Sequence, residues 1–196
     1  MGGEPQNDIV IIGSGPVALF SVFQLGLFGF KCHLIEACDR PGGQCAALYA
    51  DKPIYDVPGF PEIMGAELVE RLLRQIEPFS PVFHFKKTAK SISVGDNGVV
   101  VATGDGNKYN GRATVIASGL GAFTGDGQVI RPDPLAKLSL SRTGNMLVVS
   151  PETFRTSSPK VYAIGDACHY SGKLKLILSG FHEAALMTQA IRRELG

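Results

Sequence analysis

A β-branched apolar run that passes directly into two glycines and then into a helical pattern constrains this chain most. Residues 9–12 are uninterrupted and apolar, as in a strand buried on both faces of a parallel sheet. Gly13 can adopt the positive φ of a tight turn, Gly15 lets a pyrophosphate approach the backbone, and Ala18 allows close helix–strand packing. Pro16 suits a first helical turn, whose free N–H groups and dipole attract anions. The pattern G-x-G-x-x-A thus predicts a dinucleotide site.

A second strand and an acid follow at the spacing that such a site requires. Residues 31–36 are short and apolar and end in Glu36, 23 residues after Gly13. A carboxylate there accepts hydrogen bonds from an adenosine ribose and repels a ribose 2'-phosphate, which favours FAD or NAD over NADP. A turn glycine pair and an unrelated surface glutamate would explain either signal alone. The strand, helix and acid together favour the nucleotide site.

Composition is that of an ordinary soluble protein of one domain, or of one domain and a small appendage. The chain has 196 residues, of which 44% are hydrophobic and 19% charged, with a formal net charge of +1. It has no Lys/Arg cluster, which argues against nucleic acid or an anionic membrane as a partner. No apolar run reaches the ~18 residues of a membrane span, and the polar, acidic start lacks the pattern of a signal peptide. The expected location is the cytoplasm.

The cysteines give no sign of a disulfide framework or a metal site. None stands in a C-x-x-C pair or at zinc spacing, so we expect reduced thiols at Cys32, Cys38, Cys45 and Cys168. Cys45 is nearest to the expected chemistry, but no base is adjacent to it in sequence, which disfavours a redox role. His169 closely follows Asp166, yet a loop histidine is more often solvated than catalytic. We therefore predict no catalytic side chain and no metal.

The middle of the chain alternates loops, one helix and short strands. A turn-rich loop is expected over 37–44, and 54–61 fits neither helix nor strand. Tyr49 and Tyr55 could stack on an aromatic cofactor or pack under a loop, and the sequence leaves both open. Residues 63–79 have the spacing of an amphipathic helix. Strands at 82–85, 89–94 and 99–102, with a hairpin turn at 95–98 and a further strand pair at 108–109 and 113–117, predict a small antiparallel meander.

The last third of the chain supplies further strands, a ligand-binding edge and a closing helix. The run 113–117 breaks at Ser118 and Gly119, and the run 161–164 leads into Gly165 and Asp166, so both strands end where open α/β sheets bind ligands. Residues 122–140 are expected to be loop, and 146–149 another strand. The helical pattern of 174–195 places Leu176 on its apolar face and aims its free N–H groups at whatever Asp166 holds. These elements predict an α/β fold with a Rossmann-like parallel sheet, helices on both faces and a small antiparallel β-meander.

Several motifs together resemble the thioredoxin-reductase-like ferredoxin–NADP reductases, over residues 8–123 and about 145–194. They are Gly13-Ser-Gly-Pro-Val-Ala18, Glu36, Gly42-Gly-Gln-Cys-Ala-Ala-Leu-Tyr49, Ile54-Tyr-Asp-Val-Pro-Gly-Phe-Pro61, Ala163-Ile-Gly-Asp166 and Gly172-Lys-Leu-Lys-Leu-Ile177. The resemblance implies FAD, with the following contacts. Adenine and ribose would lie at Gly13, Ser14, Gly15, Pro16, Val17, Glu36 and Ala89, the flavin end at Gln44, Tyr49 and Phe123, and the ribityl chain on Asp166, with further contacts at Ala37, Gly43, Ser118, Gly119 and Gly165.

The resemblance also implies an activity and partners. In such enzymes NADPH reduces the flavin by hydride transfer, and the flavin passes single electrons to ferredoxin or flavodoxin. Members of this family dimerise, so a homodimer is expected. The protein supplies binding and electrostatics, and the isoalloxazine does the chemistry.

The chain departs from this family where a second nucleotide-binding domain is expected. Family members insert an NADPH-binding domain between the strand ending near Ala117 and the strand near Met146, but here fewer than thirty residues join those strands, without a second glycine motif. We therefore expect one FAD-binding domain over 1–196, with 8–123 and 145–194 as its two halves and 124–144 as a linker replacing the NADPH domain. Because the sequence stops at Gly196, we also expect no counterpart of the C-terminal tail that covers one flavin face in relatives.

Three functions remain open at the level of sequence. The first is a flavoprotein oxidoreductase domain of the ferredoxin/flavodoxin–NADP reductase type that has no docking site for NADPH. The second is a non-catalytic, minimal or engineered FAD-binding module. The third is an NAD-dependent dehydrogenase, which shares the first motif but gives no reason for Gly165-Asp166 or for the closing helix.

Overall fold

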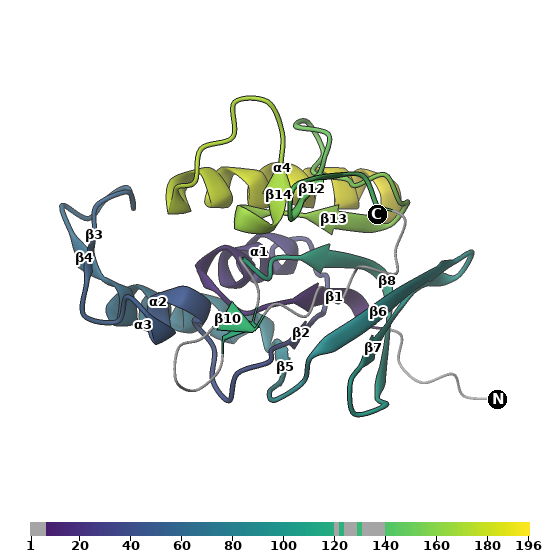
Figure 1. Cartoon of the computed structure of the whole chain (residues 1–196), viewed down its shortest axis with the longest axis horizontal. Helices are drawn as coiled ribbons and strands as arrows, with labels where there is room; N and C mark the ends of the chain where they lie inside the picture. The colour runs from purple at the N-terminus through teal and green to yellow at the C-terminus, as the bar shows by residue number, and fades with distance from the viewer. Residues whose placement is uncertain (1–6, 120–121, 124–128, 131–139) are drawn as a thin grey trace.

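A parallel sheet with β1 (Asn7–Ile12) at its centre organises the computed structural model, which describes residues 7–119, 122–123, 129–130 and 140–196 (Figure 1). The sheet has seven strands in the order β5-β2-β1-β8-β7-β6, and β13 pairs with β8. β2 (Cys32–Ile35) and β8 (Lys108–Ile116) flank β1 in parallel register, followed outward by β5 (Val82–His84) and β13 (Val161–Ala163). Residues 9–11 are fully buried, as the continuous apolar run predicts.

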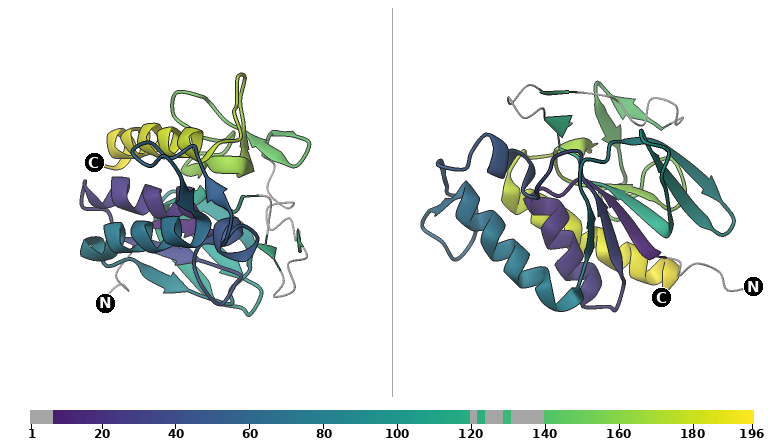
Figure 2. Two further views of the ribbon diagram at one scale, coloured as in Figure 1. Left: turned by 90° about the vertical axis from the view of Figure 1, so that its left-hand side faces the viewer. Right: turned by 90° about the horizontal axis from the view of Figure 1, so that it is seen from below.

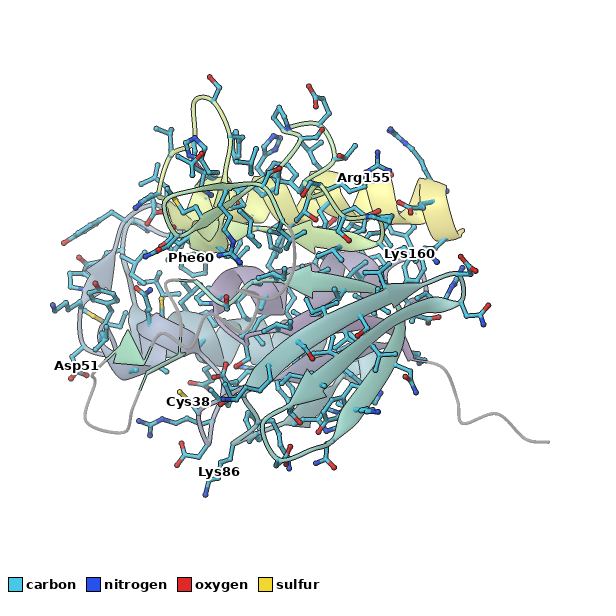
Figure 3. The ribbon with its side chains drawn as sticks, turned by 45° about the vertical axis from the view of Figure 1, so that its right-hand side comes forward. Cys38, Asp51, Phe60, Lys86, Arg155 and Lys160 are labelled. Carbon is cyan, nitrogen blue, oxygen red and sulfur yellow. The ribbon has the colours of Figure 1, made fainter. Side chains whose placement is uncertain are left out.

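The antiparallel meander shares a strand with the parallel sheet. β6 (Ala89–Gly95) and β7 (Gly98–Thr103) form the predicted hairpin, and the Nζ of Lys160 donates to the carbonyl oxygens of Gly95 and Asp96 at its turn, at 2.9 and 2.7 Å (Figure 3). β8 is one continuous strand, where the sequence predicts a pair at 108–109 and 113–117. Its first residues pair antiparallel with β7 and its later residues parallel with β1. β5 joins the parallel sheet beside β2, not the meander.

Three helices lie side by side in one layer, as both views of Figure 2 show. α1 (Pro16–Gly26) lies between α3 (Gly65–Ile76) and α4 (Ile177–Leu195) and packs against both. The predicted Rossmann-like α/β fold is confirmed. These three helices form one packed layer, and the meander strands β6 and β7 continue the same sheet beyond β8.

Short elements connect the strands of the sheet and the three long helices. They are α2 (Gly43–Ala47), β3 (Pro53–Ile54), β4 (Ile63–Met64), η1 (Glu77–Phe79), β9 (Ala122–Phe123), β10 (Val129–Ile130), β11 (Arg142–Thr143), β12 (Met146–Val148), η2 (Gly165–Ala167) and β14 (Cys168–His169). β3 and β4 pair across the segment expected to be irregular, and β12 pairs with β11 and β14 in a sheet of its own. The end of the predicted loop 37–44 is the start of α2.

The closing helix starts later than its sequence pattern predicts. α4 begins at Ile177, so Leu174 and Leu176 precede it and are 60% and 45% exposed, and Leu176 is not on a buried helical face. The apolar positions that the pattern places further along, Ala184, Met187 and Ile191, are fully buried.

The described residues contain neither a candidate membrane-spanning helix nor a candidate metal site. Within residues 7–119, 122–123, 129–130 and 140–196, no helix has the length and apolar character to cross a membrane. The same ranges contain no group of three or more His, Cys, Asp or Glu placed to hold a metal ion. Most of the predicted linker 124–144, including Gly125-Asp126-Gly127, lies outside them.

Candidate dinucleotide-binding site

A cavity of about 1080 Å³ opens at the carboxyl ends of β1, β8 and β13. It lies where the chain order reverses in the sheet, with β2 on one side of β1 and β8 on the other, which is the usual ligand position in open α/β sheets. The predicted site residues that line it are Gly13, Ser14, Gly15, Pro16, Val17, Glu36, Ala37, Gly43, Gln44, Tyr49, Ala89, Ser118, Gly119, Gly165 and Asp166. Phe123 stands in β9, and its side chain lies outside the described residues.

The two glycines of the first turn have different roles. Gly13 has φ +103°, and a Cβ built on it would lie 2.5 Å from the carbonyl oxygen of Ala117, so only glycine fits where β1 passes the end of β8. A Cβ on Gly15 would meet nothing within 4 Å. Packing therefore requires Gly13, whereas the missing side chain of Gly15 leaves open space on the cavity wall.

The N-terminus of α1 faces this open space without a side-chain cap. Gly15 is its N-cap, no described side chain bonds to its first N–H groups, and its first turn contains no acid. Pro16 at the first position has no N–H to satisfy. The remaining free N–H groups and the positive end of the helix dipole form an anion site that no described side chain fills.

A second glycine turn, at Gly42 and Gly43, packs against the first. The N–H of Gly42 donates to the carbonyl oxygen of Ser14 at 2.9 Å, and a Cβ on Gly43 would lie 3.1 Å from the Cα of Gly15. Gly42 and Gly43 have φ of +115° and +54°. The motif Gly42-Gly43-Gln44 therefore fixes the glycine turn in place and starts α2 at the cavity wall.

Glu36 is a buried carboxylate at the end of β2. It is 7% exposed, its Oε2 accepts from the Oγ of Ser14 at 2.6 Å, and its Oε1 accepts from the backbone N–H of Cys38 at 2.9 Å. Cys38 follows on the loop after β2 (Figure 3). Each carboxylate oxygen keeps a lone pair for a further donor. The two bonds therefore orient Glu36 to receive vicinal hydroxyl groups.

At the other end of the cavity, an acid already occupies the N-terminus of α4. Ile177 and Asp166 both line the cavity, as expected. The N–H groups of Ile177 and Leu178, however, donate to Oδ2 of Asp56, at 2.6 and 3.4 Å. The prediction that these N–H groups are free for a ligand is therefore wrong, because the β3–β4 hairpin delivers a carboxylate to them.

Sequence reasoning missed the cations and one acid of the cavity wall. Lys52, Lys87, Arg142 and Lys175 line it, as does Asp56. These cations come from four separate segments of the sequence, and only folding gathers them. Asp56 belongs to the motif 54–61 but shows no helix-capping signal, since the helix it caps begins 121 residues later.

The side chains of Tyr49 and Tyr55 are exposed and are not packed under a loop. Tyr55 is 68% exposed and Tyr49 is 39% exposed, and both line the cavity. The Nζ of Lys52 lies 5.1 Å from the centroid of the Tyr49 ring. Both rings are therefore available for contact with a planar ligand.

Burial raises the pKa of the thiols of Cys32, Cys45 and Cys168 and keeps them protonated at neutral pH. Cys45 lines the cavity and is 7% exposed, and burial, with a smaller effect of Asp56, raises its pKa to about 11. A thiol with this pKa is not a nucleophile at neutral pH. His169, in β14, is not among the described residues that line the cavity. Neither side chain supports acid–base or thiolate chemistry.

Comparison with known proteins gives the family. A protein of Mesorhizobium japonicum named ferredoxin–NADP reductase is 31% identical over 316 aligned positions, which span 98% of this chain and 92% of that protein. The chain belongs to the ferredoxin–NADP reductase family. A ferredoxin–NADP reductase of Leptothrix cholodnii is 47% identical, with 98% of this chain and 86% of that protein covered. No family model matches the chain.

Solved structures agree with this family membership at the level of the fold. The thioredoxin reductase of Streptococcus pyogenes has a TM-score of 0.80 at 15% identity, covering 96% of this chain and 98% of that one. The thioredoxin reductase of T. acidophilum has a TM-score of 0.80 at 14% identity, covering 95% and 98%. At such identities the likeness concerns the architecture, which the ferredoxin–NADP reductase family member described here shares.

Proposed function

We propose that this chain binds FAD and is an electron-transfer domain of the ferredoxin/flavodoxin–NADP reductase type. One observation carries the proposal. An uncapped helix N-terminus, the open space at Gly15 and the buried, oriented carboxylate of Glu36 line the same cavity of about 1080 Å³. These features fit a pyrophosphate and an adenosine ribose without any change of the chain.

The residues present fit the two ends of FAD. The first N–H groups of α1 would hold the pyrophosphate, Glu36 would accept from the ribose hydroxyls, and Asp166 would accept from the ribityl chain. Gln44 and Tyr49 lie on the wall proposed for the ring system. When bound, FAD supplies two-electron and one-electron redox chemistry. The chain orients it and leaves the exposed tyrosines at the rim of the cavity.

We further propose that the chain lacks an NADPH-binding domain and forms a single FAD-binding domain from 8–123 and 145–194. The 316 aligned positions exceed the 196 residues of the chain, so more than a third of those positions in the relative have no counterpart here. A carboxylate at Glu36 also disfavours a 2'-phosphate at the one glycine motif in the sequence. Ferredoxin, named in the relatives, is the proposed partner that exchanges electrons with the flavin, with flavodoxin as an equivalent. The proposed assembly is a homodimer.

The test is the visible absorption spectrum of the purified chain with FAD, under anaerobic conditions. Flavin bands that survive NADPH but bleach with dithionite support a flavin domain without a hydride donor. Rapid bleaching by low NADPH would contradict the loss of the NADPH site. A chain that retains no FAD after reconstitution would contradict the whole proposal.

A bare cofactor module would be recognised by a second readout. The dithionite-reduced protein is mixed with oxidised ferredoxin or flavodoxin, and electron transfer is followed spectroscopically. Rapid reoxidation supports an electron-transfer domain. Reoxidation no faster than that of free reduced FAD supports a module that only binds the cofactor.

A further inference from the structure

A second buried carboxylate lies behind the cavity and is not part of its wall. Glu183, on α4, is fully buried. It does not line the cavity, whereas Gly165 and Asp166 do. A charged group in such a place costs several kcal/mol unless it is paired and hydrogen-bonded. Its partners therefore indicate what the charge maintains.

All the described partners of Glu183 come from one segment, residues 165–173. Oε2 accepts from the backbone N–H of Gly165 at 2.6 Å and from the Sγ of Cys168 at 3.7 Å. Oε1 accepts from the hydroxyl of Tyr170 at 2.9 Å and from the Nζ of Lys173, a side chain that is only 5% exposed. The single carboxylate therefore ties both ends of this segment to α4.

The same segment depends on Glu183 for its shape. Gly165 has φ +66° and lies beyond the end of β13, so its N–H has no partner in the sheet ladder and needs another acceptor. Burial and the bond to Glu183 raise the pKa of the Tyr170 hydroxyl well above its usual range, and burial with the nearby Glu183 charge raises the pKa of Cys168 to about 12. Both groups therefore remain donors at physiological pH. The two oxygens of Glu183 thus accept from four described donors, and one of these, Lys173, is the cation that balances the charge.

α4 is in turn fixed against the glycine turn of the first motif. A Cβ on Gly180 would lie 2.3 Å from Cγ2 of Val17, which shows how closely α4 crosses the start of α1. Gly180 and Glu183 are one helical turn apart on the same side of α4. A continuous set of contacts therefore leads from Val17 through Gly180 and Glu183 to Gly165, and so to Asp166.

We propose that Glu183 is a positioning residue: paired with Lys173, it holds the Gly165-Asp166 turn in the conformation that receives the flavin half of FAD. This inference rests on the proposed function. It assigns no cofactor contact to Glu183 itself. The adenosine half, held by Gly15 and Glu36 on other elements, does not depend on it.

The test compares the affinity for FAD, which has both halves of the cofactor, with the affinity for ADP, which has only the adenosine half. Apoprotein is titrated with FAD by flavin fluorescence and with ADP by calorimetry, for the wild type and for Glu183→Gln. Glutamine presents an NH₂ group to either Gly165 N–H or Lys173, so one bond to the segment is lost. We expect affinity for FAD to fall about 10- to 100-fold, the amount given by a hydrogen bond to a charged group, and affinity for ADP to change less than about twofold.

A carboxylate on the same helix provides a matched control. Glu194 bonds to the hydroxyl of Tyr162 at the far end of α4 and does not line the cavity. Glu194→Gln removes one charge and one acceptor from α4 and should leave both affinities unchanged. Equal losses for FAD and ADP in Glu183→Gln, or no loss for either, would overturn the positioning role. A wild type that binds ADP but not FAD, or neither, would instead refute the proposed function.

A double variant separates positioning from stability. Glu183→Leu with Lys173→Met removes both buried charges together, which is often neutral or stabilising, while Glu183→Leu alone leaves an unpaired cation. We expect the double variant to regain most of the thermal stability that Glu183→Leu loses. Its affinity for FAD should stay low, because Gly165 still lacks an acceptor. Recovery of FAD affinity along with stability would show that Glu183 serves folding alone.

Discussion

At the scale of single residues, the two glycines of the first turn separate stability from binding. In Gly13→Ala the new Cβ lies 2.5 Å from a backbone oxygen at a φ of +103°, so we expect the free energy of unfolding to fall by about 2–4 kcal/mol. Gly15 has φ −71° and ψ 177°, and a Cβ there meets nothing within 4 Å. Gly15→Ala should change stability by no more than about 1 kcal/mol.

Affinity for FAD, in contrast to stability, should depend on Gly15. The methyl group of Gly15→Ala occupies the space that a pyrophosphate would enter, so affinity for FAD should fall at least about tenfold in a variant that remains folded. Urea denaturation and FAD titration of both variants check this. Full FAD affinity in Gly15→Ala would mean that the ligand does not approach the backbone at this turn.

The residues that sequence reasoning found and missed differ in one physical respect. Gly13, Gly15 and Glu36 act through local backbone geometry and fixed spacing, which a short motif encodes. Lys52 and Lys175 reach the cavity only through tertiary folding, and their sequence neighbourhoods resemble any solvated surface. Glu183 gave no signal because a glutamate in an amphipathic helix is normally solvent-exposed, and here it is fully buried.

At the scale of elements, Asp56 joins the β3–β4 hairpin to α4. Its carboxylate accepts from the first N–H groups of that helix and complements the helix dipole. We expect Asp56→Ala to lower the free energy of unfolding by about 1 kcal/mol and to speed hydrogen exchange at Ile177 and Leu178. Asp51→Ala, an exposed position before the hairpin, is the control. Unchanged exchange at both amides would show that the bond does not hold the helix start.

Element boundaries were harder to predict than element types. The sequence pattern predicts a start at residue 174, three residues early, because Leu174 and Leu176 continue the apolar spacing. The carboxylate of Asp56, which accepts from the N–H of Ile177, decides where the helix begins. The sequence pattern predicts two strands in place of β8, because the first half of β8 is buried on one side and its second half on both. A single strand combines the two patterns by pairing with β7 in its first half and with β1 in its second.

At the scale of the whole molecule, the parallel sheet and the position of the cavity at its carboxyl edge followed from the sequence. The apolar runs, the glycine turn and the rule that ligands bind at the carboxyl edge sufficed for them. The single helical layer did not follow, because nothing local in α1, α3 or α4 states which face of the sheet each helix covers. That choice depends on the connections between the strands and on the packing of α1 between α3 and α4.

The buried thiols should make the folded molecule lose stability at alkaline pH. Burial raises the pKa of Cys32 to about 12 and that of Cys45 to about 11, from 9.0. Each folded-state pKa exceeds its unfolded value, so the folded form holds a proton that the unfolded form releases. The contribution to stability is complete below pH 9 and is lost as pH rises through the folded-state pKa.

Cys32 allows the effect of one thiol to be measured alone. It is a buried residue of β2 and does not line the cavity. Between pH 10 and 11 one extra bound proton corresponds to a slope of about 1.4 kcal/mol per pH unit. Cys32→Val keeps an apolar side chain of similar size, so its free energy of unfolding should fall less steeply than that of the wild type by about this amount. Urea denaturation at pH 8, 9, 10 and 11 measures both slopes. Parallel curves for the two proteins would show that Cys32 ionises as readily in the folded sheet as in the unfolded chain.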